Sequence, residues 1–350
     1  MSKLSPTLKA LIESPAARPN TTPAPAWIRD VYSRILLEGK QKQYGIRPFV
    51  ALAAATTFTL NSPASLVALH SITSSTTPFL TPLSTAELIR EIGLKCISFN
   101  GIPRTINCLG EFKSAMNVNP WAAQLCTAPS RQVTYKNIDA VQARGQQLWD
   151  SIYTPFEKKL VKKLAESHPD LPVHILGSHY GPLLANPPED NRGNSRQQDN
   201  NSSGLADERR QLGSVGRCLT SIVAVACLRA QTGVGPQVLS HVFGLKKAIE
   251  QGWAEKEYSG GGLGGKTDAG ETEALRRVGA SDEGLEWILN SVDKIAKAIS
   301  GKRGNYAAEW ELKGNEEVVE GEIIDNGKEG TQAVEKDVVD KEERELRSKL

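Results

Sequence analysis

The sequence predicts an all-α protein. Apolar residues recur at helical spacing in one segment after another, and clean two-residue alternation is almost absent. Capping residues and prolines stand at the ends of these segments, as they do at helix boundaries. We expect one helical domain over residues 27–300, after a flexible lead over 1–26 and before a disordered charged tail over 301–350.

Each predicted helix rests on its apolar spacing and on the residues at its ends. The Ala-rich segment Phe49–Leu60 favours a buried helix over a strand because alanine has the highest helix propensity. Ser84 followed by Glu87 matches a capping box, which marks the start of another helix. In chain order the predicted helices are 27–37, 49–60, 64–72, the helix capped by Ser84, 104–116, 137–150, 155–167, 217–231, 236–251 and 281–300.

Two segments inside the domain do not fit the helical pattern. Residues 186–208 are polar and of low complexity, which predicts a disordered insertion. Residues 255–280 are rich in glycine and predict a loop between helices. Within that loop, Gly260–Thr267 (GGGLGGKT) matches the phosphate-binding pattern GxxxxGK[ST], but the polar residues before it do not predict the buried strand that such a loop follows. We therefore expect no nucleotide site there.

A weak internal repeat runs through the predicted helices. An apolar Ala-rich helix, a proline turn, a helix ending in His and an acidic capped helix occur around Phe49–Ile92 and again around Cys218–Leu289. His70 and His241 hold corresponding places in the two halves. We expect two copies of one helical unit that pack face to face.

Composition argues against several classes of function. The formal net charge of +2 gives no electrostatic reason to expect nucleic acid or an anionic membrane as a partner. No segment approaches the ~18–20 apolar residues of a membrane span. The five cysteines form no CxxC pair, which argues against a disulfide framework and a structural zinc site, and they read as small buried hydrophobes. No cofactor is expected.

Three stretches of the chain resemble the carboxymuconolactone decarboxylase-like family, which shares the AhpD-like all-helical fold. They are Gly145–Leu184, Thr85–Leu109 with its ending FNGIPRTINCL, and Arg217–Gly252 followed by SDEGLEWIL. The family pattern falls here on Arg217, Gly233, Gly235, His241, Gly244 and Gly252. The resemblance implies an AhpD-like bundle that assembles into a homo-oligomer, a trimer or a multiple of it, and it is nearest to fungal peroxisomal members of the family.

The departures from the family pattern bear on activity. The peroxidase branch has a CxxC pair before the His, but Val234 and Gln237 stand at those positions here, so no thiol there can attack a peroxide. The decarboxylase branch resembles this chain better. It implies that Arg217 holds a substrate carboxylate in a two-pronged contact and that His241, beside Ser240, moves a proton.

The resemblance therefore implies cofactor-free decarboxylation or proton transfer on a small carboxylated lactone or organic acid. The alternative is that His241 only packs between helices and donates one hydrogen bond. The protein would then be a catalytically silent binding or assembly protein that keeps the fold.

The last three residues match a targeting signal. Ser348-Lys349-Leu350 spells the tripeptide that a peroxisomal import receptor reads at a free C-terminus, and the charged tail lets it protrude. We expect a peroxisomal matrix protein with that receptor as a partner. Lys3, Lys9 and Arg18 near the N-terminus faintly resemble a mitochondrial presequence, which leaves dual targeting open.

Overall fold

The computed structural model describes residues 4–76, 80–187, 213–257 and 266–301, which form helices and contain no β-strand. The all-α prediction is confirmed. The α-helices are α1 (Pro6–Ile12), α2 (Ile28–Gln41), α3 (Ile46–Thr59), α4 (Pro63–Thr76), α5 (Pro82–Lys95), α6 (Ile97–Asn100), α7 (Ile102–Met116), α8 (Ile138–Tyr153), α9 (Glu157–Ser167), α10 (Asp170–His174), α12 (Arg217–Gln231), α13 (Gly235–Glu250), α14 (Trp253–Glu257), α15 (Lys266–Ala280) and α16 (Asp282–Ser300). Two 3-10 helices, η1 (Pro15–Ala17) and η2 (Pro120–Gln124), and a π-helix, η3 (Ile175–Leu184), complete the set.

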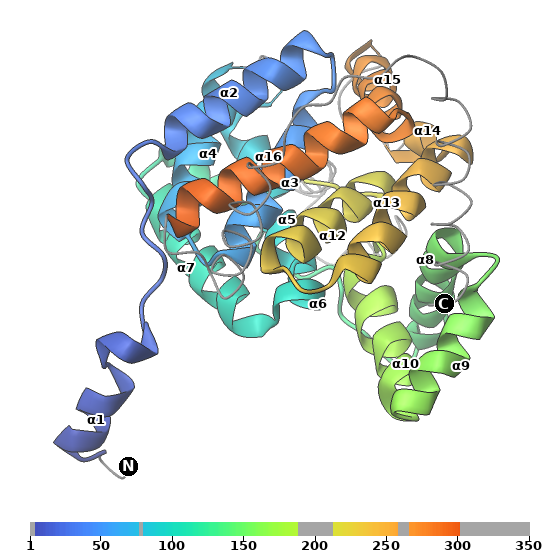
Figure 1. Cartoon of the computed structure of the whole chain (residues 1–350), viewed down its shortest axis with the longest axis horizontal. Coiled ribbons are helices and arrows are strands. Elements are labelled where there is room, and N and C mark those ends of the chain that lie inside the picture. The colour runs from blue at the N-terminus through green and yellow to red at the C-terminus, as the bar shows by residue number, and fades with distance from the viewer. Residues whose placement is uncertain (1–3, 77–79, 188–212, 258–265, 302–350) are drawn as a thin grey trace, which may run out of the picture.

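The helices α3 and α12 form the centre of the bundle, and α16 lies across both of them (Figure 1). Every residue of α3 is buried, because the helix is apolar or small on all sides and has neighbours all round. The hydroxyls of Thr56, Thr57 and Thr59 each donate to the carbonyl four residues earlier, at 2.6–2.8 Å. These bonds satisfy polar groups that would otherwise be costly at the centre of the core.

The structure repeats the order of elements expected from the internal repeat. The buried α3 is followed across a short turn by α4, and the buried α12 is followed in the same way by α13. His70 comes 24 residues after Ile46, the first residue of α3, and His241 comes 24 residues after Arg217, the first residue of α12. The two central helices pack against each other, as two copies of one unit meeting face to face would.

A buried carboxylate holds the N-terminus of each central helix. Glu271 of α15 accepts hydrogen bonds from the first two amides of α3, at 3.3 and 3.4 Å. Glu257 of α14 accepts from the amides of Cys218 and Leu219 in α12, at 2.7 and 3.1 Å. A helix N-terminus has free N–H groups and the positive end of the dipole, so each carboxylate is well placed. Burial nevertheless raises the pKa of both carboxyls.

The Gly-rich segment differs from its prediction. Only residues 258–265 lie outside the described residues, and the rest of the expected loop is helical, in α14 and α15. Ala274, Leu275 and Val278 are buried, so α15 is stabilised by the packing of an apolar stripe. The prediction of a loop rested on the glycines nearby and did not take this stripe into account. The described residues just before the phosphate-binding pattern form helix α14, and not the buried strand that such a loop follows.

The predicted start of one helix needs correction. Thr81, and not Ser84, caps α5: its Oγ1 accepts the Ser84 amide at 3.1 Å, so the predicted capping box was wrong. The lead contains the short helix α1, which Ser5 caps and which lies away from the body in Figure 1. Residues 188–212, which hold most of the predicted insertion, and residues 302–350, with the terminal tripeptide, lie outside the described residues.

Candidate active site

Arg217 lies buried at the first position of α12 and donates only to neutral oxygens. Its Nε and Nη1 donate to the hydroxyls of Ser151 and Ser221 at 2.7 and 2.5 Å. Its Nη2 donates to the carbonyls of Ser151 and Gly244 at 3.3 and 2.9 Å. In the part of the chain that the structure describes, no carboxylate forms an ion pair with this guanidinium. Part of its stabilisation comes from α8, whose last turn presents the Ser151 carbonyl and the negative end of the helix dipole.

His241 lies on α13 with its ring enclosed by aromatic side chains. Its exposed fraction is 6%. The rings of Phe99 and Tyr153 meet it edge to face, with centroids 6.0 and 6.2 Å away. Its Nδ1 has no hydrogen-bond partner among the described residues. Burial, and then the charge of Arg217, lower the pKa of His241 to about 3, so the imidazole is uncharged near neutral pH.

Two tyrosines and a tryptophan form the wall beside His241. The Tyr180 hydroxyl donates to the Tyr153 hydroxyl at 3.2 Å, and the Trp149 ring packs on both at centroid distances of 5.0 and 4.2 Å. Burial raises the pKa of both tyrosines, so their hydroxyls stay protonated. The wall therefore offers protonated hydroxyls and ring edges next to an uncharged imidazole.

The close contact of α8 with the π-helix η3 positions this wall. A Cβ at Gly145 would lie 2.5 Å from the Gly181 amide nitrogen, and a Cβ at Gly181 would lie 2.7 Å from the Val141 carbonyl oxygen. Only glycine at both positions allows the two backbones to approach so closely. π-Helical turns are rare and are frequent at functional sites. Gly177 also lies inside η3.

A buried lysine lies near this site, and the sequence analysis missed it. Lys95 is fully buried, and its ammonium lies 2.6 Å from the carbonyls of Leu184 and Val215, 2.9 Å from Asn186 Oδ1 and 3.0 Å from Thr220 Oγ1. Burial lowers the pKa of Lys95 to about 7, although the charges of nearby glutamates oppose the change. The apolar neighbours of this lysine in the sequence (IGLKCIS) were the only signal that could have predicted its burial.

The structure brings together the two residues predicted to form the site. Arg217 donates to the Gly244 carbonyl, three residues after His241 on the same helix, and its charge acts on the imidazole. Ser240 is not part of the arrangement, because its hydroxyl donates to the Pro236 carbonyl at 2.9 Å and is exposed. The predicted Ser-His pair is therefore absent from the described structure.

The corresponding histidine in the first half of the repeat has a different environment. The Nε2 of His70 forms a 2.8 Å hydrogen bond with the Pro82 carbonyl, and its ring stacks on Trp121 with centroids 5.5 Å apart. His70 is thus a core histidine with a polar partner, as expected for a structural residue. His241 differs because its Nδ1 has no partner among the described residues. His70 therefore serves as the matched control for substitutions at His241.

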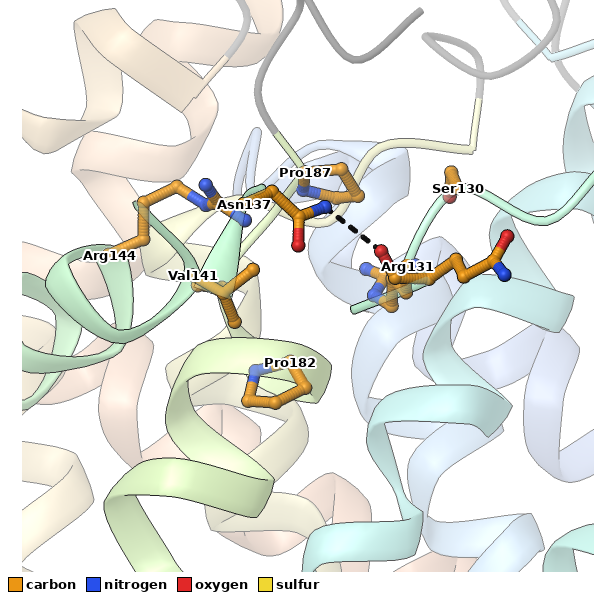
Figure 2. A pocket seen from close by; sticks show the side chains of 9 residues that line it. Ser130, Arg131, Asn137, Val141, Arg144, Pro182 and Pro187 are labelled. Atoms are coloured by element: carbon orange, nitrogen blue, oxygen red, sulfur yellow. Dashed lines mark hydrogen bonds between the residues drawn. The ribbon is translucent and has the colours of Figure 1, made fainter. Parts of the chain in front are cut away.

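A small hollow lies at the other end of α8, lined by Arg131, Asn137, Val141, Arg144 and Pro182 among others (Figure 2). Its volume of about 10 Å³ is room for about one water molecule. Val141 precedes Ser151 by ten residues on α8, about 15 Å along the helix axis. The hollow is therefore separate from Arg217 and His241.

Among the described residues, no cluster of His, Cys, Asp and Glu has the arrangement of a metal site.

Comparison with known proteins gives one informative match. No protein-family model matches the chain, and no solved structure matches it. A curated relative, Peroxisomal protein 2 of Saccharomyces cerevisiae (strain ATCC 204508 / S288c), is 31% identical over 114 residues, which cover 27% of this chain and 40% of the relative. The chain thus matches less than half of that relative's length. The resemblance to carboxymuconolactone decarboxylase-like proteins remains a prediction. None of the helices in the described ranges has the length and apolar character needed to cross a bilayer.

Proposed function

We propose that this chain is a peroxisomal matrix protein whose Arg217–His241 site carries out cofactor-free decarboxylation or proton transfer on a small carboxylated organic acid or lactone. The location is supported by the tripeptide Ser348-Lys349-Leu350 and by the name of the relative. The chemistry is supported by the resemblance to carboxymuconolactone decarboxylase-like proteins and by the geometry around His241. That resemblance also supports assembly into a trimer or a multiple of it.

The observation that carries the chemical proposal is the unpartnered Nδ1 of His241. A buried polar atom without a hydrogen bond costs about 1–3 kcal/mol, so most proteins do not keep one without a use. His241 is uncharged near neutral pH and can accept a proton from a substrate or share one with it. The protonated hydroxyl of Tyr153, which accepts a hydrogen bond from Tyr180, is the neighbouring donor.

Arg217 gives the site its charge. A guanidinium has five N–H groups, and four hydrogen bonds are made here, which leaves one N–H of Nη1 without a partner in the described structure. That group can bind one carboxylate oxygen of a substrate. A two-pronged contact would require Arg217 to give up a serine or carbonyl partner. An anion bound there would oppose the charge of Arg217 and raise the pKa of His241 toward its ordinary range.

The test compares His241 with its counterpart in the first half of the repeat. Wild type, His241→Asn and His70→Asn are incubated with a panel of lactone acids, and CO2 release and exchange of solvent deuterium into the acids are measured. We expect loss of at least about 100-fold in rate for His241→Asn, a typical contribution of general acid–base catalysis, and little change for His70→Asn. Equal rates for all three folded proteins would contradict a catalytic role.

The location is tested independently of the chemistry. A fluorescent protein is fused to the N-terminus of the full chain and of a variant that lacks Leu350. We expect the full chain to coincide with a peroxisomal marker and the truncated variant to remain outside peroxisomes, because the receptor reads the terminal carboxylate and the leucine side chain. Peroxisomal import of the truncated chain in cells without an untagged copy would contradict a direct role of the tripeptide.

A catalytically silent binding or assembly protein is the second candidate function. Arg217 favours it, because four of its N–H groups already bind Ser151, Ser221 and Gly244, where they join α8 to α12 and α13. In this case Arg217→Met would lower the stability of the fold, and the acid panel would give no turnover with the wild type. Binding of an acid without turnover, detected by a raised pKa of His241 in an NMR titration, would identify this second function.

A further inference from the structure

Two buried cysteines that are far apart in the sequence meet in the core. Cys96 ends α5, Cys227 lies on α12, and their Sγ atoms are 3.5 Å apart. Both side chains are fully buried, and both are free thiols. Along the sequence these cysteines are indistinguishable from separate small hydrophobes, because no spacing relates positions 96 and 227. Their contact is a consequence of the packing of α5 and α6 on α12.

We propose that Cys96 and Cys227 form an internal redox site that is closed to a disulfide by hydrogen peroxide. The two sulfurs are in direct contact, so closure to the disulfide length of about 2.05 Å needs a movement of only ~1.5 Å. Cys96 lies at the junction between α5 and α6, where the chain leaves one helix and enters the next, and such a position adapts more easily than a mid-helix residue. This inference does not depend on the peroxisomal location or on the chemistry of His241.

The environment of Cys227 favours it as the sulfur that reacts first. The amide Nδ2 of Asn100 lies 3.5 Å from Cys227 Sγ and donates a hydrogen bond to it, which places a polar N–H group beside this sulfur. Asn100 is half-buried, so it connects the pair to the surface, and its Oδ1 is held by the Thr59 hydroxyl at 3.1 Å. Among the described residues no amide N–H donates to Cys96 Sγ, which accepts from the Cys227 thiol, and burial raises the pKa of Cys96. Cys96 is therefore better placed as the resolving thiol, which is the second thiol that attacks oxidised Cys227 and closes the disulfide.

The reaction balances with one peroxide and two thiols. The Cys227 thiolate attacks one peroxide oxygen, the O–O bond breaks, and the protonated second oxygen leaves as water, which gives a sulfenic acid. The Cys96 sulfur then attacks the sulfenic sulfur, the S–O bond breaks and a second water leaves. Two thiols are oxidised by two electrons to one disulfide, and the peroxide is reduced to two waters. The burial of both sulfurs makes this a slow, stoichiometric reaction.

The pair is coupled by position to the Arg217–His241 site. The four-residue helix α6 runs between Cys96 and Asn100, and both of these residues contact Cys227. Phe99, on the same short helix, meets the ring of His241 edge to face. A disulfide would fix the start of α6 to α12, and the aromatic contact of His241 lies on that fixed segment.

The experiment uses the full chain with Cys126 replaced by Ser, because Cys126 is the half-buried thiol that is open to side reactions. The native protein is exposed to hydrogen peroxide, then denatured and alkylated, and its thiols are counted by mass spectrometry. We expect the four remaining thiols to fall to two with a mass loss of about 2 Da. Peptide mapping should show a bond between Cys96 and Cys227.

Single Ser replacements at Cys96, Cys227 and Cys108 in this background provide the controls. Cys108 is the matched control, since it is also buried and lies close enough to influence the pKa of Cys96. We expect the disulfide to be lost with either member of the pair replaced and kept with Cys108→Ser. A bond between Cys96 and Cys108, oxidation to sulfonic acid without a bond, or an unchanged thiol count with both peroxide and diamide would overturn the proposal.

Discussion

Replacing Lys95 with methionine tests how the structure holds a charge in its core. Methionine keeps the length of the side chain and removes its nitrogen. The carbonyls of Leu184 and Val215, each 2.6 Å from that nitrogen, would be left buried without their donor. The ammonium has three N–H groups for four nearby oxygens, so the oxygens compete for it and these two carbonyls are the nearest.

The size of the effect depends on pH. Above pH 10.5 the amine is uncharged in both the folded and the unfolded chain, and its loss costs mainly the two orphaned carbonyls, about 3 kcal/mol in total. The pKa of Lys95 is about 7 in the folded state and 10.5 in the unfolded chain, so between these values the unfolded state binds more protons and stability rises with pH. That rise amounts to about 2 kcal/mol from pH 7 to pH 9. The methionine variant lacks this rise, so we expect its stability relative to the wild type to fall by about 2 kcal/mol from pH 7 to pH 9, and to approach a deficit of about 3 kcal/mol above pH 10.5.

Urea denaturation of both proteins at pH 7, 8 and 9 measures this difference. Glu91, Arg131 and Glu257 also act on Lys95, and all three are present in both proteins. Lys162→Met, on the exposed face of α9, is the control and should stay within about 0.5 kcal/mol of the wild type at each pH. A Lys95→Met penalty that is constant from pH 7 to pH 9, or that shrinks, would refute the reasoning.

Two further predictions concern the contact of α8 with η3 and the cap of α12. Gly181→Ala should lower the free energy of unfolding by about 1–3 kcal/mol, because the new Cβ would lie 2.7 Å from the Val141 carbonyl oxygen. Gly177→Ala on the same π-helix meets nothing within 4 Å and should leave stability unchanged or raise it by up to about 1 kcal/mol, so equal denaturation midpoints for the two variants would contradict this account. Because burial raises the pKa of Glu257 above 4.5, the folded state holds its proton more tightly than the unfolded state. The wild type should therefore lose stability relative to Glu257→Gln as the pH rises through the raised pKa. Denaturation from pH 4.5 upward measures that difference, and a difference independent of pH would contradict a raised pKa of Glu257 in the folded state.

Local patterns predicted the fold well where packing and sequence agree. The predicted helix 217–231 has the bounds of α12, and that at 281–300 starts at Ser281, the residue that caps α16. The neighbourhood of Arg217 and His241 could also be predicted, because both residues lie in one helical hairpin whose geometry is set by a short turn. The pairing of the two central helices followed from the internal repeat.

The features that could not be predicted depend on contacts between distant segments. Glu257 and Glu271 are ordinary acidic residues in a polar stretch, and only the three-dimensional structure places them on the N-termini of α12 and α3. The contact between Cys96 and Cys227 arises in the same way. Helix α15 was missed because the glycines before it outweighed the apolar stripe that packing buries.

The hydrogen bonds around Lys95 have a consequence for how the length of this chain can change. Asn186 and Ser214 are joined by a side-chain hydrogen bond of 3.3 Å, and the same lysine binds Leu184 and Asn186 on one side and Val215 on the other. The two edges of residues 188–212 are thus fastened side by side by groups that belong to the core. A natural or engineered variant can therefore carry a shorter segment here, or a whole inserted domain. The distance between the two chain ends that the segment must join stays the same.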